Sequence, residues 1–101
     1  LNPADLGIPH ARLDDLRGGS PAENAQVVRH VLAGETGAVR DIVLLNAAAG
    51  LVAFDLAENP SSIEVPILQR LQSQMLVCAE AIDTGAAAAK LDAWVTATRA
   101  A

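Results

Sequence analysis

The stretch that decides the fold class is SPAENAQVVRHVLAG, residues 20–34. It opens with a capping box, in which the Ser20 hydroxyl and the Glu23 carboxylate each accept a hydrogen bond from an amide at the helix start. Pro21 suits the first helical position, because it has no amide hydrogen to leave unpaired. Apolar residues then recur on one face, at Ala25, Val28, Val31 and Leu32. Gly34 ends this pattern, which therefore predicts an amphipathic helix.

A second and longer helix is expected to begin at Thr36 or Gly37 and to run to about Ala57. Its apolar residues lie almost all the way round the helix: Val39, Ile42, Val43, Leu44, Leu45, Leu51, Val52, Phe54 and Leu56. A helix that is apolar on every side is a buried one, so we expect neighbours on several of its faces. The small residues at 47–50 would let another backbone approach closely.

The C-terminal half predicts two further helices. A loop at residues 58–62 follows the long helix, and either Ser61 or Ser62 can cap the next one, with Pro66 in its first turn. The packing face of that helix repeats every three or four residues, at Leu68, Leu71, Met75, Cys78 and Ile82. A last helix, from about Ala86 to Arg99, presents Leu91, Trp94, Val95 and Thr98 on one side.

The N-terminal residues 1–12 are expected to be irregular or extended. Pro3 and Pro9 each disfavour a helical conformation in the residue before them. Residues 12–17 could form one short helical turn, which Gly18-Gly19 would close.

The composition supports a mainly α fold with about four main helices in a single unit, residues 1–101. Hydrophobic residues make up 51% of the chain, 21 of its residues are alanine, and it has one Phe and one Trp. Alanine and leucine rank highest in helix propensity, whereas aromatic and β-branched residues favour strands.

Charge and cysteine content exclude some classes of function. The net charge of −5 argues against nucleic acid and against an anionic membrane as partners. No apolar run reaches the roughly 18 residues that a membrane-spanning helix needs, and no secretory signal is present. Cys78 is the only cysteine and cannot form an internal disulfide, so we expect a cytoplasmic protein.

Several stretches, in this order and at these separations, resemble the C-terminal region of anthranilate phosphoribosyltransferases. They are Gly18–Ala25, Val31–Glu35, Arg40–Ala48 and Ala81–Ala87. Before them, Asn2–Gly7 is similar to the extended segment that precedes these stretches in the family. The Ala-Ile-Asp-Thr-Gly run and the Trp in the last helix are similar to actinobacterial members. The resemblance covers nearly the whole chain.

The resemblance implies an enzyme of tryptophan biosynthesis that transfers the ribosyl-5-phosphate of phosphoribosyl pyrophosphate to anthranilate with the help of Mg²⁺. It further implies that residues 1–101 are the C-terminal helical part of the larger α/β catalytic domain. The chain begins at Leu1 in what reads as mid-domain sequence, so it is interpreted as a fragment. The rest of the parent chain would then be its main partner, and exposed apolar surface would favour a homo-oligomer.

No residue of this chain is assigned a catalytic, cofactor-binding or metal-binding role. The family's Gly-Thr-Gly-Gly-Asp loop, its Lys-His-Gly-Asn-Arg stretch and its Asp-Glu metal pair lie upstream of the matched region and do not occur here. Displacing pyrophosphate needs amides or cations around the phosphates and a metal held by carboxylates. The isolated chain is therefore expected to be inactive and to bind no cofactor.

Polar residues that could suggest a site are interpreted as structural. Asp14-Asp15 resembles a metal motif, but adjacent helical residues point apart. Asn46, on an apolar helix, is expected to be tied to a neighbour by hydrogen bonds, and Asn24 beside the capping box is judged in the same way. Gly18-Gly19 is too short for a phosphate loop and is taken as a turn.

The remaining candidate residues are also interpreted as structural. Asp41 suits the positive end of the long helix, and Arg40 is expected to form a weak surface ion pair rather than to reach a phosphate. His10 and His30 are far apart in sequence and lack further metal ligands nearby. Cys78 lies in an apolar stripe and reads as a small core residue rather than a nucleophile.

Two alternatives stay open. The first is a self-contained helical module that binds a partner protein, because capped helices with apolar stripes suit it equally well. The second is a fragment of another phosphoribosyltransferase or of a nucleoside phosphorylase-type enzyme, since these helices do not read the acceptor. A reading frame that extends some hundreds of residues upstream would favour an enzyme over the module.

Overall fold

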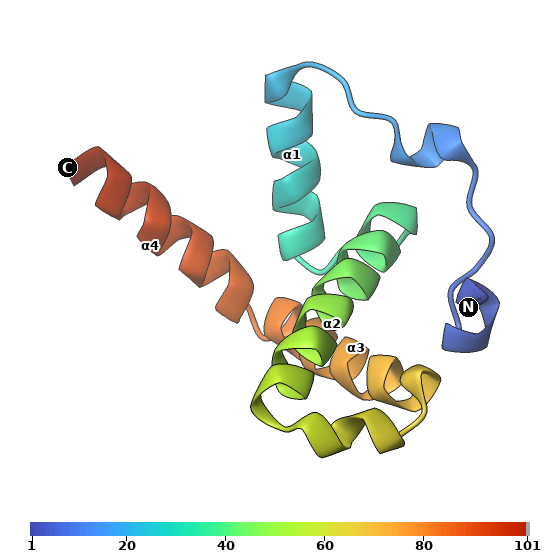
Figure 1. Ribbon diagram of the computed structural model, residues 1–101. Helices are drawn as coiled ribbons and strands as arrows, with labels where there is room; N and C mark the ends of the chain where they lie inside the picture. Colours follow the sequence, from blue (N-terminus) through green and yellow to red (C-terminus); the bar gives the residue numbers. More distant parts are fainter. Residues whose placement is uncertain (101) are drawn as a thin grey trace.

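The computed structural model describes residues 1–100, and these form helices joined by short turns (Figure 1). The elements in chain order are η1 (Pro3–Leu6), η2 (Leu13–Leu16), α1 (Pro21–Leu32), α2 (Ala38–Glu58), η3 (Pro60–Glu64), α3 (Ile67–Asp83) and α4 (Ala86–Ala100), where η marks a 3₁₀ helix. No strand occurs among the described residues. The predicted mainly α class and the four main helices are confirmed.

Helix α1 begins as its sequence predicts. The amide of Glu23 donates to the Ser20 hydroxyl at 3.2 Å, and the amide of Ser20 donates to the Glu23 carboxylate at 3.2 Å. Pro21 occupies the first turn. Beyond the end of the helix, Gly34 adopts a φ of 96°, which side chains disfavour and glycine accepts. Both ends of α1 are thus determined by local sequence.

The core lies between α2 and α3, which pack against each other and cross in Figure 1. Two clusters of buried side chains form it: Val31 with Leu44 and Ile82, and Ala48 with Val52 and Leu71. Met75 and Cys78 of α3 pack against both clusters. The predicted packing face of α3 is therefore confirmed.

The expectation that α2 is covered on several faces is wrong for this chain. Its buried residues, Leu44, Ala48 and Val52, follow one another at intervals of four and so lie on one side. Ile42, Val43, Leu51 and Phe54 are exposed, and Phe54 keeps 65% of its surface accessible. The physical reason is that α3 and η3 are the main neighbours of α2, and they cover a single face.

The start of α3 also differs from the prediction. Ser61 and Ser62 lie inside η3 and cap no helix, and Pro66 precedes α3 rather than occupying its first turn. The Ser61 hydroxyl donates to the Asn59 side chain at 2.8 Å, and the Ser62 hydroxyl is shielded without a hydrogen-bond partner. The 3₁₀ turn takes up the residues that the sequence suggested as a cap.

The N-terminal segment is more ordered than expected. Asn2 accepts a hydrogen bond from the amide of Ala4 at 3.0 Å and so begins η1, in a region that was predicted to be irregular. A proline at the first helical position helps here, because its fixed φ is already helical. The short helical turn predicted at residues 12–17 is confirmed as η2.

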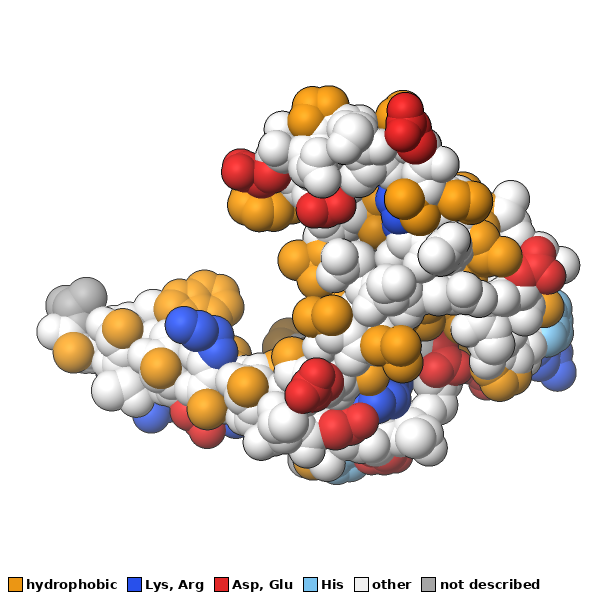
Figure 2. Space-filling view, turned by 90° about the horizontal axis from the view of Figure 1, so that it is seen from below, with side chains coloured by type: hydrophobic (Ala, Val, Ile, Leu, Met, Phe, Trp, Pro, Cys, Tyr) orange, Lys and Arg blue, Asp and Glu red, His pale blue; other side chains and the backbone are white. Residues whose placement is uncertain are grey.

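The molecule exposes more surface than a compact domain of its length. Its accessible area is 7151 Å² and its radius of gyration is 15.4 Å. A compact monomer of this size would expose about 5,400 Å² and have a radius near 13 Å. Helix α4 contributes to the difference by extending away from the α2–α3 pair (Figure 1), and Figure 2 shows the hollow that lies beside it. None of the described helices is long and apolar enough to cross a membrane.

Candidate functional site

A groove of about 550 Å³ lies between the N-terminal segment, α1 and the start of α2. Its walls come from residues 9–11 and Asp15 on one side, from Val27, His30 and Val31 of α1 on another, and from residues 35–41. A smaller cleft of about 180 Å³ lies between α2 and the start of α3. We describe the groove as the candidate site because it collects most of the polar residues that the sequence suggested.

The start of α2 forms the floor of the groove. Gly37 precedes this helix with a φ of 142° and offers no side chain, so the helix has no side-chain cap. The first amides of a helix lack partners within it and form its positive end. Asp41, in the first turn of α2, brings a negative charge to this end, as the sequence predicted.

Two histidines that are distant in sequence lie on this one groove. His10 and His30 both line it, which the sequence did not predict. The Nδ1 atom of His30 is 3.3 Å from a carboxylate oxygen of Glu35, and both side chains are mostly exposed. This contact is an ion pair only in the form in which the imidazole carries a charge. It also joins the last turn of α1 to the segment that leads to α2.

Arg40 is in a different environment from the one expected. Its guanidinium makes two hydrogen bonds to the carboxylate of Asp83, at 2.9 and 3.0 Å. Only 11% of the Arg40 side chain is exposed, whereas 54% of the Asp83 side chain is, so the pair is sheltered on the side of its cation. The pair joins the start of α2 to the end of α3, and it uses the charge that a phosphate would need.

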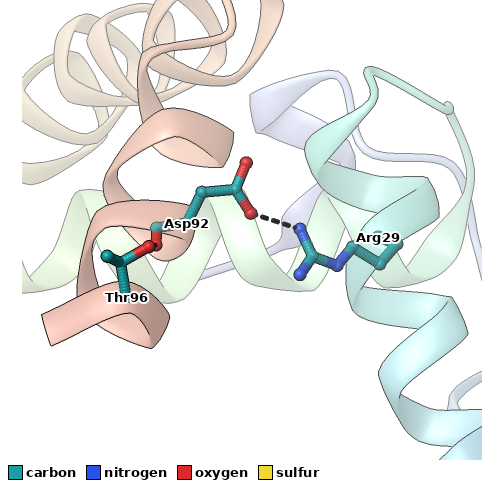
Figure 3. A network of polar contacts seen from close by, with 3 residues as sticks. All are labelled: Arg29, Asp92 and Thr96. Carbon is teal, nitrogen blue, oxygen red and sulfur yellow. Dashed lines mark hydrogen bonds and ion pairs between the residues drawn. The ribbon is translucent and has the colours of Figure 1, made fainter. Parts of the chain in front are cut away.

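A second long-range ion pair joins α1 to α4 (Figure 3). The Arg29 guanidinium donates to the Asp92 carboxylate at 2.8 Å, across 63 positions of sequence. Both side chains are more than half exposed. The hydroxyl of Thr96 donates to the backbone carbonyl of Asp92 at 2.9 Å and does not touch Arg29. Sequence reasoning expected an ion pair for Arg40 without naming its partner and missed the pair of Arg29, because no local pattern indicates partners so far apart.

Three polar residues have the structural roles that were predicted. The Asn24 side chain accepts from the amide of Gly19 at 2.8 Å and donates to its carbonyl at 3.1 Å, which fixes the Gly18-Gly19 turn. Asp15 accepts from the amide of Arg12 at 2.8 Å, and Asp14 pairs with Arg17 at 3.0 Å. The acidic pair of η2 is therefore used for local capping and pairing.

Asn46 and Cys78 complete the residues suggested by sequence. Asn46 was expected to bind a neighbour, but it lies on the exposed side of α2, where water can satisfy it. Cys78 is half-buried and packs against both core clusters, as predicted. Burial raises the pKa of its thiol, so the reactive thiolate is disfavoured.

One carboxylate in the N-terminal half has a shifted pKa. Hydrogen bonds from the Ser20 amide and hydroxyl lower the pKa of Glu23, because they stabilise its charged form. This shift belongs to the helix cap and not to the groove. Among residues 1–100, no group of three or more His, Cys, Asp or Glu side chains lies close enough together to hold a metal ion.

The chain matches known proteins over nearly its full length. Residues 1–88 match the family described as "Glycosyl transferase family, a/b domain". Anthranilate phosphoribosyltransferase from Leifsonia xyli subsp. xyli (strain CTCB07) is 60% identical over 99 residues, which is 98% of this chain and 28% of that enzyme. The enzyme of the same name from Clavibacter sepedonicus is 55% identical over 100 residues, or 99% of this chain and 28% of that enzyme.

A more distant relative gives the same coverage. Anthranilate phosphoribosyltransferase from Thermobifida fusca (strain YX) is 50% identical over 100 residues, with 99% of this chain and 27% of that enzyme covered. The chain therefore spans little more than a quarter of the length of the curated relatives it matches. No solved structure matches it.

Proposed function

The chain belongs to the glycosyl transferase family whose a/b domain matches residues 1–88, and on that premise we propose that it is part of an anthranilate phosphoribosyltransferase. The observation that carries this proposal is 60% identity to such an enzyme over 99 residues. The activity proposed for the whole protein is transfer of ribosyl-5-phosphate from phosphoribosyl pyrophosphate to the amine of anthranilate. A carbon–nitrogen bond forms at the ribose, pyrophosphate leaves, and the amine loses a proton. The product feeds tryptophan biosynthesis.

Within that enzyme we assign this chain a structural role. Its sheltered cation, Arg40, is already paired with Asp83, and its acidic pair is used within η2. The 550 Å³ groove carries three acidic side chains, from Asp15, Glu35 and Asp41, which would repel a pyrophosphate group. These contacts favour the role of a structural helical layer over that of a catalytic centre.

Mg²⁺ is part of the proposed reaction, where it would neutralise charge on the leaving pyrophosphate. The described residues do not fit such a site, because residues 1–100 contain no suitable cluster of metal ligands. We therefore assign the metal to another part of the proposed enzyme.

The proposal extends to partners and location. The rest of a longer polypeptide would be the main partner of this chain, anthranilate and phosphoribosyl pyrophosphate would be the substrates, and the enzyme would be a homo-oligomer in the cytoplasm. The net charge of −5 argues against nucleic acid, and a single cysteine suits a reducing compartment.

The test is an assay of anthranilate fluorescence on addition of phosphoribosyl pyrophosphate and Mg²⁺. The protein from the complete reading frame and the 101-residue chain would be assayed side by side. We expect loss of fluorescence with the long protein and none with the chain alone. In the long protein, Asp14→Asn should leave turnover within about twofold, because an exposed ion pair contributes less than about 1 kcal/mol.

A second candidate is a self-contained helical module that binds a partner protein. It is favoured by the exposed apolar side chains of the chain, among them Phe54, Ile63 and Leu76. A folded long protein without turnover would refute the anthranilate assignment. Other phosphoribosyl acceptors would be tested next, including those of nucleoside phosphorylase-type enzymes, and then the module.

A further inference from the structure

Helix α4 is attached to the rest of the molecule at few points. It follows α3 through a turn at Thr84-Gly85, where Gly85 has a φ of 85°. Its first turn contributes Ala87, which packs against the cluster of Val31, Leu44 and Ile82. No residue of α4 is buried, and Trp94 in its second half is 67% exposed. Beyond the first turn, Leu91 and Val95 are only half-buried, so apolar packing restrains α4 less than it restrains α3.

Helix α1 is attached in a similar way. Val31 near its end is its one buried residue, and Val27 and Val28 are exposed. Its capping contacts and the pair of His30 with Glu35 are all local, so they fix its ends but not its position. The neighbours of α1 in space are α3 and α4.

The ion pair of Arg29 with Asp92 is the contact that bridges these two helices (Figure 3). Among residues 1–100, it is the only side-chain hydrogen bond between α4 and another element. It lies one turn beyond Ala87 and two residues before the exposed Trp94, on a stretch of α4 whose Leu91 and Val95 are half-buried. An interaction at this distance from the turn at Gly85 resists rotation of the whole helix.

We propose that the Arg29–Asp92 ion pair holds α1 and α4 together, and that α4 turns away about Gly85 when the pair is broken. Because the pair is exposed, it is screened by salt, and ionic strength then controls the position of α4. Val27 and His30 of α1 also line the 550 Å³ groove. The same contact thus helps to hold one wall of that groove.

The test measures the distance between spin labels on α1 and α4 by double electron–electron resonance. Labels are attached at Ala25→Cys and Ala97→Cys, two exposed positions, in a Cys78→Ala background. In about 0.05 M salt we expect one dominant distance, since the Debye length there exceeds 10 Å. Arg29→Ala should lengthen and broaden the distribution, with the ratio of closed to open molecules falling about two- to fivefold.

Further variants distinguish the loss of this ion pair from a general loss of structure. Asp92→Asn should act like Arg29→Ala, and the double exchange Arg29→Asp with Asp92→Arg should restore the closed distance. The matched control is Arg17→Ala, which removes the same charge from a still more exposed pair with Asp14 and should not change the distance. Circular dichroism checks that each variant keeps its helices.

Salt gives an independent reading on the unsubstituted pair. Raising it to about 0.5 M should shift the parent protein toward the open distance and leave Arg29→Ala unchanged. The proposal is overturned if Arg29→Ala keeps the closed distance in low salt. It is also overturned if the exchanged pair fails to restore that distance, or if the parent does not respond to salt.

Discussion

Helices α3 and α4 are of similar length, 17 and 15 residues, yet they are held in opposite ways. Helix α3 fully buries Leu71 and Ile82 against its neighbours, while α4 has no fully buried residue. Helix α4 begins with four alanines, the best helix formers, so its local sequence alone favours the helix. The comparison shows that forming a helix and fixing its position are separate requirements, and that α4 meets mainly the first.

The two long-range ion pairs repeat this contrast. Arg40 and Asp83 are joined by two hydrogen bonds between α2 and α3, and the Arg40 side chain is sheltered there, whereas Arg29 and Asp92 share one hydrogen bond between two exposed side chains. Water screens exposed charges and allows their side chains to move, so an exposed pair contributes little. We therefore expect the Arg40–Asp83 pair to contribute more to the stability of the molecule than the Arg29–Asp92 pair.

The largest expected effect comes from the core. Leu71→Ala should lower the free energy of unfolding by about 2–5 kcal/mol, because it removes a side chain that is 4% exposed and leaves a cavity. Trp94→Ala, a larger truncation on α4, should change it by less than about 0.5 kcal/mol. Urea denaturation followed by circular dichroism measures both. Equal losses of unfolding free energy would contradict the contrast between the two helices, since α4 would then be as well packed as α3.

A smaller effect is expected from the sheltered ion pair. Arg40→Ala should cost about 1–2 kcal/mol of unfolding free energy, because the Asp83 carboxylate loses two charge-assisted hydrogen bonds. Arg29→Ala is the matched control and should cost less than about 1 kcal/mol. The same denaturation experiment supports the contrast between the two ion pairs if Arg40→Ala lowers the free energy of unfolding more than Arg29→Ala does. Identical costs would mean that shelter gives the Arg40 pair no advantage.

The smallest effect concerns the cap of α1, the other weakly packed helix. The lowered pKa of Glu23 means that its contribution is present above the ordinary value of 4.5 and is lost as the pH falls through the lowered value. Thermal melts below pH 4.5 should therefore show a steeper loss of stability for the parent than for Glu23→Gln. Glutamine can still accept the Ser20 amide but does not titrate. Parallel pH profiles would show that the cap contributes no measurable pH dependence.

Local signals in the sequence predicted the helices. They did not predict which faces of the helices are covered by other elements. The cap at Ser20 and Glu23 and the spacing of Leu71, Cys78 and Ile82 depend on residues within a few turns, so they could be read directly. The exposure of Phe54 could not, because periodicity identifies an apolar face without saying whether another element lies against it.

The candidate site shows the same limit. Asn24 and Asp15 make contacts within five residues, and their structural roles were predictable. The meeting of His10 with His30 in one groove, and of Arg40 with Asp83, depends on how distant helices pack. A charged residue has many possible partners in a sequence, and only the fold selects one.

The exposed position of Trp94 has a spectroscopic consequence. The chain has one Trp and no Tyr, so its intrinsic emission excited at long wavelength comes from α4 alone. An indole that is already hydrated will emit at nearly the same wavelength before and after the α2–α3 core unfolds. Fluorescence melting curves should therefore be flat where circular dichroism shows a transition. The molecule carries an optical reporter for its C-terminal helix that does not sense its core.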